Sequence, residues 1–166
     1  SSAASDVYKR QLYVFNKNEN IGFIKGHMCS PAIATQAEDL IAGGVKELIH
    51  VGYAGGLQPE LVPGEIILTD GAFNDTAVAR LYGYDYDIIH SSKDLTNEIE
   101  EMITSAEILY KRGFHWTTDE GYRETWGQVM DYRDKGALCV EMEGVGLFTI
   151  ANYRKCVATG IYVVSD

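Results

Sequence analysis

Two carboxylates flank a single methionine near the carboxyl end of the chain. Glu141 and Glu143 lie on either side of Met142, in a segment that is otherwise apolar. Burying an unpaired carboxylate costs several kcal/mol, so each group needs a partner. That partner is either an internal Arg or Lys or a bound ligand. No base stands beside the two acids in the sequence, which favours a ligand, and the hydroxyls of a sugar are suitable donors to a carboxylate.

Polar residues also lie at the ends of three other predicted strands. His50 precedes a glycine-bearing stretch at 52–56, and two further polar groups lie at 117–119 and 165–166. Glycines let the backbone approach a ligand closely, and consecutive N–H groups can form an anion-binding concavity, although a plain tight turn fits the same residues. Because ligands in open α/β sheets bind beyond the carboxyl ends of the strands, we expect these groups to converge on one site.

Short β-type runs alternate with helical patterns along the chain, and several of the runs are apolar on both faces. This alternation predicts an α/β fold with a largely parallel sheet. A Ser-Pro pair and a capping-box pattern mark two of the helix starts. The predicted strands are 12–15, 21–24, 47–51, 65–69, 114–118, 138–143 and 157–164. The predicted helices begin at 30, 94, 125 and 145, and we expect irregular structure at 71–92.

Length and composition indicate one globular domain. The chain has 166 residues, of which 46% are hydrophobic, enough for a packed core. We assign residues 12–166 to a single domain that is incomplete at both ends, and residues 1–11 to a leader-like segment. The net charge of -10 disfavours nucleic-acid binding, and no apolar run reaches the ~20 residues of a membrane helix.

Cysteine and histidine usage narrows the class of protein further. The three cysteines form no CxxC pair, and their odd number fits a reducing, cytoplasmic setting better than a disulfide framework. The four histidines have no metal-ligand spacing, so we expect no metal site. We expect three of them to be structural or surface residues, with His50 placed for a ligand.

The order and spacing of several motifs resemble the nucleoside phosphorylase superfamily, which includes purine nucleoside and uridine phosphorylases. The resemblance covers residues 26–166, and Val-Glu-Met-Glu-Gly at 140–144 is its most specific part. The other segments that carry it are GHMCSP at 26–31, GVKELIHVGYAGGL at 44–57, PGE at 63–65, TTD at 117–119 and SD at 165–166. The fold implied is a three-layer α/β sandwich whose mixed, mostly parallel sheet curls toward a barrel.

The resemblance also implies roles for the 140–143 segment. Glu143 would bind the ribose hydroxyls while Met142 packs on the sugar. Val140 and Glu141 would lie beside the base. Glu143 would then act in catalysis by stabilising the positive sugar that forms as the glycosidic bond breaks.

Four further residues are expected to contact the base. Ala54 and Gly55 resemble the loop that passes the base. Asp166 matches the acid that protonates the purine N7 in purine-specific members and helps the base to leave. Tyr122 is the nearest aromatic residue to the position, here Gly121, where the family has an aromatic wall.

Phosphate, the implied co-substrate, would contact Gly26, His50 and Tyr53, and no cofactor is implied. The family carries Arg where this chain has His50, and Ser or Thr where it has Tyr53. Arg is a permanent bidentate donor, whereas His is charged only in part near neutral pH. The glycine- and arginine-bearing phosphate loop of the family has no counterpart in these residues.

These motifs predict a phosphate-dependent phosphorylase that releases the base, with a purine favoured, and ribose 1-phosphate. Loss of the phosphate-binding Arg keeps hydrolysis by a nucleosidase as an alternative, and a non-catalytic nucleoside-binding chain is a third. The family usually forms dimers that build hexamers, so we expect a homo-oligomer. For these 166 residues alone we expect little or no activity.

Overall fold

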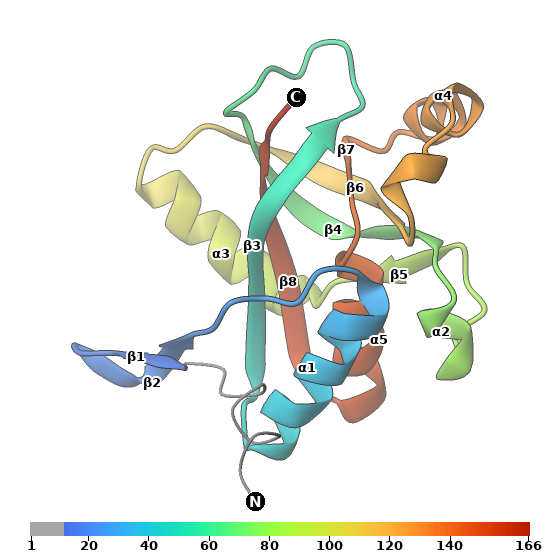
Figure 1. The fold of residues 1–166 in the computed structure, drawn as a ribbon. Coiled ribbons are helices and arrows are strands. Elements are labelled where there is room, and N and C mark those ends of the chain that lie inside the picture. Colours follow the sequence, from blue (N-terminus) through green and yellow to red (C-terminus); the bar gives the residue numbers. More distant parts are fainter. Residues whose placement is uncertain (1–11) are drawn as a thin grey trace, which may run out of the picture.

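The computed structural model describes residues 12–166, so the leader-like segment predicted at 1–11 lies outside the described residues. Strands and helices alternate along most of the described chain (Figure 1). The strands are β1 (Tyr13–Phe15), β2 (Asn18–Phe23), β3 (Glu47–Gly56), β4 (Ile66–Asp75), β5 (Ile88–His90), β6 (Tyr110–Thr118), β7 (Cys139–Glu141) and β8 (Val157–Val164). The helices are α1 (Ser30–Ala42), α2 (Val78–Leu81), α3 (Lys93–Ser105), the 3₁₀ turn η1 (Gly121–Arg123), α4 (Trp126–Asp134) and α5 (Gly144–Arg154).

The central sheet is mixed and curls until its last strand, β8, pairs with β4. Its strand order is β5-β4-β6-β7-β3-β8, and β4 also pairs with β8. The pairs β3–β8, β4–β6 and β6–β7 are parallel, whereas β3–β7, β4–β5 and β4–β8 are antiparallel. The prediction of an α/β fold with a curled mixed sheet is therefore confirmed, and the curl reaches barrel-like closure. The two longest pairings, β3–β8 and β4–β6, are parallel.

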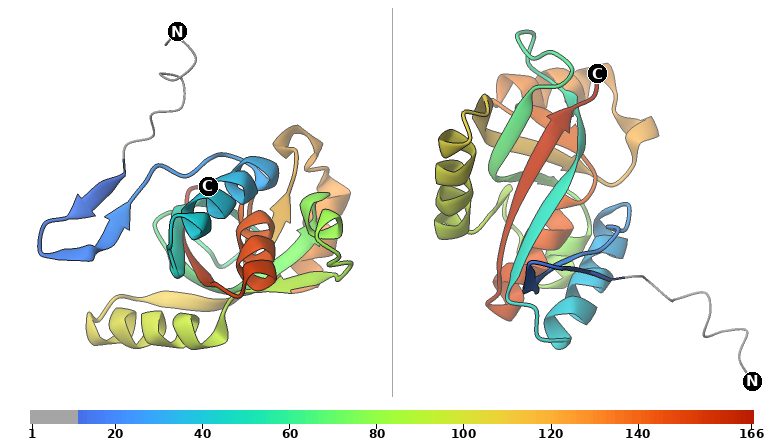
Figure 2. Two further views of the ribbon diagram at one scale, coloured as in Figure 1. Left: turned by 90° about the horizontal axis from the view of Figure 1, so that it is seen from below. Right: turned by 90° about the vertical axis from the view of Figure 1, so that its left-hand side faces the viewer.

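Helices cover the sheet from two sides. Figure 2 shows α3 on one side of the curled sheet and α1 and α5 together on the other. Residues that alternate along β4 serve both sides of the sheet: Ile67 packs with Tyr162 and Val164, whereas the next residue, Leu68, packs against α3. This alternation explains why β4 is apolar on both faces.

Helices α1 and α5 cross closely at their amino-terminal ends. A Cβ atom on Gly146 would lie only 2.4 Å from the carbonyl oxygen of Ser30, so glycine is needed for this approach. The contact brings the start of α1 against the segment that joins β7 to α5, where the Glu-Met-Glu residues lie.

Several local predictions are confirmed. The capping box is formed: the Thr125 hydroxyl accepts the N–H of Gln128 at 3.4 Å, and the Gln128 side chain accepts the N–H of Thr125 at 3.3 Å. Strand β8 has the predicted bounds. The Ser-Pro pair marks the start of α1 to within one residue: Ser30 is predicted to cap the helix, but Cys29 takes the capping position, and Ser30 and Pro31 lie in the first turn.

Three local predictions are wrong for reasons of strand pairing. Residues 52–56 are not a loop but continue β3, because β8 pairs with this strand up to Ala54 and β7 pairs with its last two residues. The stretch 71–92 is not irregular throughout, since it holds the end of β4, then α2 and β5. Strand β7 ends at Glu141 rather than at residue 143, so Glu141 and Glu143 do not share a strand face.

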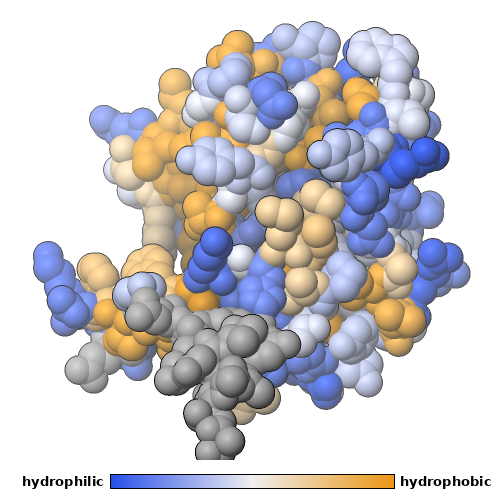
Figure 3. Space-filling view, in the orientation of Figure 1, coloured by the Kyte–Doolittle hydropathy of each residue, from blue (hydrophilic) through white to orange (hydrophobic). Residues whose placement is uncertain are grey.

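The molecule keeps an apolar surface over β3 and the β1–β2 hairpin. Ile49, Val51 and Tyr53 lie on the exposed side of β3. Figure 3 shows apolar side chains gathered over this part of the face. Along residues 12–166 no helix is both long enough and apolar enough to cross a membrane.

Candidate functional site

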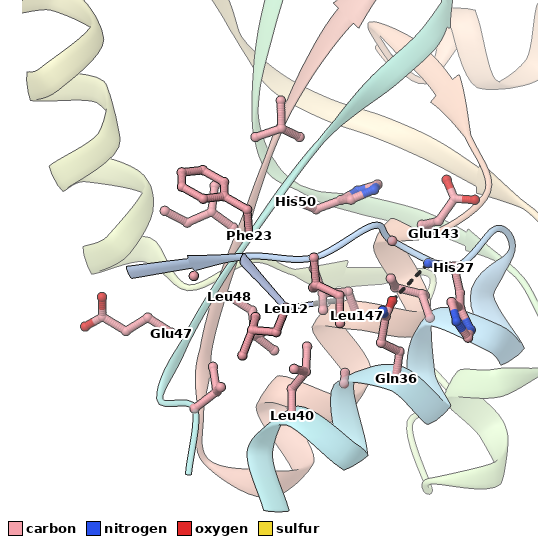
Figure 4. Close-up of a pocket in the computed structure, with 18 of the residues that line it drawn as sticks. Leu12, Phe23, His27, Gln36, Leu40, Glu47, Leu48, His50, Glu143 and Leu147 are labelled. Atoms are coloured by element: carbon pink, nitrogen blue, oxygen red, sulfur yellow. Dashed lines mark hydrogen bonds between the residues drawn. The ribbon is translucent and has the colours of Figure 1, made fainter. Parts of the chain in front are cut away.

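A pocket of about 1140 Å³ opens between β3, α1 and the β1–β2 hairpin. Figure 4 shows Glu143 and His50 pointing into the same end of this pocket from the start of α5 and from β3. Gly26, His27 and Tyr53 also line the pocket. The rest of the pocket is lined largely by apolar side chains: Leu12, Phe23, Leu40, Leu48 and Leu147.

Glu143 is the residue that precedes α5, and each of its carboxylate oxygens accepts one backbone N–H. Its Oε1 accepts the N–H of Cys29 at 2.7 Å, and its Oε2 lies 3.3 Å from the N–H of its neighbour Met142. A carboxylate offers about four acceptor positions, so others are left for a ligand in the pocket. Burial raises the pKa of Glu143, the N–H of Cys29 lowers it, and the negative charge of Glu141 adds to the increase, which prevails.

The start of α1 is shaped to hold this segment. Cys29 has φ 71°, an uncommon conformation for a residue with a side chain, and its N–H is directed at the Glu143 carboxylate. The hydroxyl of Ser30 donates to the carbonyl oxygen of Met142 at 3.0 Å. These two contacts fix Met142 and Glu143 against α1.

Glu141 lies behind this segment, and every hydrogen bond of its carboxylate is made inside the chain. Its side chain is 1% exposed and faces His115, whose Nε2 lies 3.0 Å from Oε1. Thr117 donates its hydroxyl to the same oxygen. The N–H groups of Glu143 and Gly144 donate to Oε2, each at 2.9 Å.

These contacts explain why an acid is buried at the end of β7. The first N–H groups of a helix have no partner within it, and a negative charge is favoured there. Burial raises the pKa of Glu141, but the charge of His115 and the hydrogen bonds from His115 and Thr117 lower it to about 2. The partner of this acid is therefore an imidazole and a helix start rather than Arg or Lys. Its expected contact with a base stays a prediction.

The residues expected to hold phosphate all line the pocket. The Nδ1 of His50 is 3.4 Å from the hydroxyl of Tyr162, and burial lowers the pKa of His50, which the charge of Glu141 only partly offsets. The His50 ring is thus more often neutral near neutral pH than an exposed histidine. Tyr53 is 77% exposed, and Gly26 lies where β2 leads toward α1.

Most of the residues expected to surround the base form a second group, outside this pocket. Gly55 pairs with Val140 across the β3–β7 ladder, and Ser165 donates its N–H to Ala54. The carbonyl oxygen of Asp166 accepts the N–H of Gly56, and a Cβ atom on Gly55 would lie 3.8 Å from its Oδ1. The structure thus gathers Ala54, Gly55, Val140 and Asp166 at the carboxyl ends of β3 and β8.

The polar stretch after β6 divides between other places. Thr117 contacts Glu141, whereas Asp119 accepts the N–H of Ala77 at 2.9 Å. Tyr122, in η1, is fully exposed. The polar strand ends that we expected to converge therefore lie in separate surroundings, and the pocket holds His50 and Glu143.

His115 is a partner of Glu141 that the sequence did not reveal. His115 and Thr117 are two apart in a strand, so they share a face. A polar pair on one face of an otherwise apolar strand is the signal that could have revealed this buried cluster. Among the described residues, no group of three or more His, Cys, Asp or Glu side chains is arranged to hold a metal ion.

The curled sheet, covered by helices on two sides, defines a mixed α/β domain with a pocket at the amino-terminal end of α5. The family model described as the phosphorylase superfamily matches residues 7–166. The chain therefore belongs to the phosphorylase superfamily.

Two curated relatives are named "Purine nucleoside phosphorylase DeoD-type". The protein from Exiguobacterium sibiricum is 32% identical over 163 residues, which cover 95% of this chain and 69% of the relative. The protein from Caldanaerobacter subterraneus subsp. tengcongensis is 33% identical over 156 residues, which cover 87% of this chain and 67% of the relative. The chain thus spans about two thirds of the length of these relatives.

A solved structure shares the fold. It is described as the P knowlesi homolog of P falciparum PNP, and it matches with a TM-score of 0.75 at 24% sequence identity. The match covers 81% of this chain and 57% of that chain. It confirms the phosphorylase-like fold of the described residues.

Proposed function

We propose that the full-length protein is a nucleoside phosphorylase that acts on purine nucleosides. The observation that carries this proposal is the Glu143 carboxylate, held by Cys29 and open to a pocket that His50 also lines. The names of the curated relatives support the same reaction class. The substrates would be a purine nucleoside and inorganic phosphate.

In the proposed reaction the bond between the anomeric carbon and the base breaks, and a bond from that carbon to a phosphate oxygen forms. Glu143 accepts hydrogen bonds from the ribose hydroxyls and stabilises the positive sugar in the transition state. Met142 packs on the sugar. The electron pair of the broken bond leaves with the base, which receives a proton at N7 from Asp166.

The remaining expected contacts belong to the same proposal. Gly26, His50 and Tyr53 would hold phosphate in the pocket. The base would lie against a set of residues at the ends of β3 and β7 and in η1: Ala54, Gly55, Val140, Glu141 and Tyr122.

Hydrolysis is a second candidate, and one observation favours it. Burial lowers the pKa of His50, so the ring at the expected phosphate position is a weak anion-binding group near neutral pH. Lys46 also lines the pocket, but it precedes His50 by four residues of extended chain, which is about 13 Å. A neutral imidazole suits activation of a water molecule better than binding of phosphate.

The test is base release from inosine, adenosine and uridine by the full-length protein, with and without phosphate. We expect release from a purine nucleoside only when phosphate is present, with ribose 1-phosphate as the sugar product. Phosphate-independent release of free ribose would replace phosphorolysis with hydrolysis. Release from uridine alone would refute the purine assignment. No release from any of the three nucleosides would refute the proposal that the protein is a nucleoside-cleaving enzyme.

Self-association is proposed as well. Large apolar patches are uncommon on monomers, and Ile49, Val51 and Tyr53 expose such a patch on β3. Light scattering on the full-length protein tests this proposal, with a homo-oligomeric mass as the expected result and a monomer as the contrary one.

A further inference from the structure

A chain of buried hydrogen bonds joins strand β4 to the start of α5. The hydroxyl oxygen of Thr69 lies 2.6 Å from Nδ1 of His115, and Nε2 of the same ring lies 3.0 Å from Glu141. Glu141 in turn accepts the N–H groups of Glu143 and Gly144. Thr69 and His115 are fully buried and do not line the pocket.

The chain begins at an irregularity in β4. The pairing of β4 with β6 shifts register between Thr69 and Gly71, as at a β-bulge. Gly71 has φ 147°, and a Cβ atom there would lie 2.6 Å from the carbonyl oxygen of Ile89. The Thr69 hydroxyl contacts both backbone polar groups of Gly71, its carbonyl oxygen at 2.8 Å and its N–H at 3.1 Å. Bulges commonly re-aim a side chain beside a functional site, and this one fixes the Thr69 hydroxyl toward His115.

The hydroxyl of Thr69 suits either protonation state of His115. When it donates to Gly71 it accepts Nδ1–H, and the imidazole then carries protons on both nitrogens. When it donates to Nδ1, the ring is neutral and keeps its proton on Nε2. In both arrangements Nε2–H donates to Glu141, so the carboxylate stays free to accept the backbone N–H groups of α5.

We infer that Thr69 and His115 are positioning residues for Glu143. They hold Glu141 in place, and Glu141 fixes the backbone at Glu143 and Gly144, which aims the Glu143 carboxylate into the pocket. The inference rests on the proposed role of Glu143 in binding the sugar.

Two other contacts support the start of α5 independently of Thr69, so removing the Thr69 hydroxyl tests positioning rather than folding. The N–H of Val145 is capped by the Thr117 hydroxyl at 3.2 Å, and Ser30 holds the carbonyl oxygen of Met142. Helix α5 and the Met142 backbone therefore keep these partners when the Thr69 hydroxyl is removed. What changes is the orientation of Glu141 and hence of the peptide that carries Glu143.

The test compares Thr69→Val with Thr159→Val in the full-length protein. Thr159 is a matched control, because it is also fully buried in the sheet and also bonds another side chain, Thr96 at 2.7 Å, but it does not contact the His115–Glu141 pair. The readouts are the amide ¹H–¹⁵N chemical shifts of Glu143 and Gly144, the unfolding midpoint, and kcat/KM for the nucleoside that is cleaved. Thr69→Ser restores the hydroxyl and is the rescue variant.

We expect Thr69→Val to shift both amides and to lower kcat/KM about fivefold, the factor that corresponds to one typical hydrogen bond. Thr159→Val should lower the unfolding midpoint about as much as Thr69→Val does, but it should leave both amide shifts and kcat/KM unchanged. Thr69→Ser should resemble the wild type. Unmoved amides in Thr69→Val, or an equal loss of kcat/KM in the two valine variants, would overturn the inference. The amide shifts decide it even if no nucleoside is cleaved, because that result counts only against the proposed function.

Discussion

The interior behind the start of α5 and the pocket in front of it each hold one carboxylate, and the two acids are only two residues apart. Behind the helix, Glu141 is surrounded by donors from His115, Thr117 and the helix backbone, and its pKa falls to about 2. In the pocket, the Glu143 carboxylate accepts the backbone N–H groups of Cys29 and Met142, and burial raises its pKa. The comparison shows that two acids of one motif can have different roles: Glu141 stabilises the start of the helix, and Glu143 faces the pocket.

The largest effect is expected where the buried acid is removed. Glu141→Ala leaves His115 and two helix N–H groups without their acceptor, and breaking such a buried pair costs about 3–5 kcal/mol. We expect that loss in the free energy of unfolding, measured by urea denaturation of the full-length protein. Glu98→Ala, on the exposed side of α3, is the control and should stay within about 0.5 kcal/mol of the wild type. Equal losses in the two variants would refute the structural role of Glu141.

A smaller effect is expected from crowding the same contact. In Gly144→Ala the added Cβ would lie 2.5 Å from Nε2 of His115, and overpacking of this kind costs about 1–3 kcal/mol. Gly127→Ala, in α4, is the matched control because its Cβ would meet no atom within 4 Å. We expect urea denaturation to show a loss in the first variant and none in the second. A Gly144→Ala protein as stable as the wild type would mean that the helix start and His115 are less closely packed than described.

The pH dependence of stability should have opposite signs for the two acids. An unfolded glutamate has a pKa of about 4.3. Above that value the raised pKa of Glu143 lets the folded state bind more protons than the unfolded state, so this group lowers stability as pH rises. The lowered pKa of Glu141 gives the reverse: its stabilisation is present above about 4.3 and is lost as pH falls toward about 2.

Glu143→Gln should therefore gain stability relative to the wild type between about pH 4 and pH 7, whereas Glu141→Gln should be less stable than the wild type at neutral pH. Urea midpoints at the two pH values measure both differences. Changes of the same sign in the two variants would remove the distinction between the acids.

Much of the fold was predictable because its signals are local. The Ser-Pro start of α1, the capping box of α4 and the apolar run of β8 each lie within a few residues of sequence. The prediction failed at 71–92, where β4 and β5 are defined by pairing with other strands rather than by their own pattern. The glycines at 52–56 also led to a wrong strand end at residue 51, because only the pairing of β3 with β8 and β7 shows that the strand continues to Gly56.

The sequence identified the segment that carries the two acids, but not the different roles of Glu141 and Glu143. The sequence indicates that Glu141 and Glu143 need partners, yet the partner His115 lies 26 residues away and is brought close by the parallel pairing of β6 with β7. An early end of β7 then separates the two acids, which no local pattern shows. The orientation of the Cys29 N–H likewise depends on the positive φ of Cys29, which no sequence pattern predicts.

The most direct test of the account is kcat/KM of Glu143→Gln in the full-length protein, measured with the nucleoside that the wild type cleaves fastest. Replacing the carboxylate by an amide removes charge-assisted hydrogen bonds worth about 1.5–3 kcal/mol. We predict a fall of about 10- to 100-fold in kcat/KM with no decrease in the unfolding midpoint. A value near that of the wild type would contradict the account, because the acid that faces the pocket would then have no part in gripping the substrate.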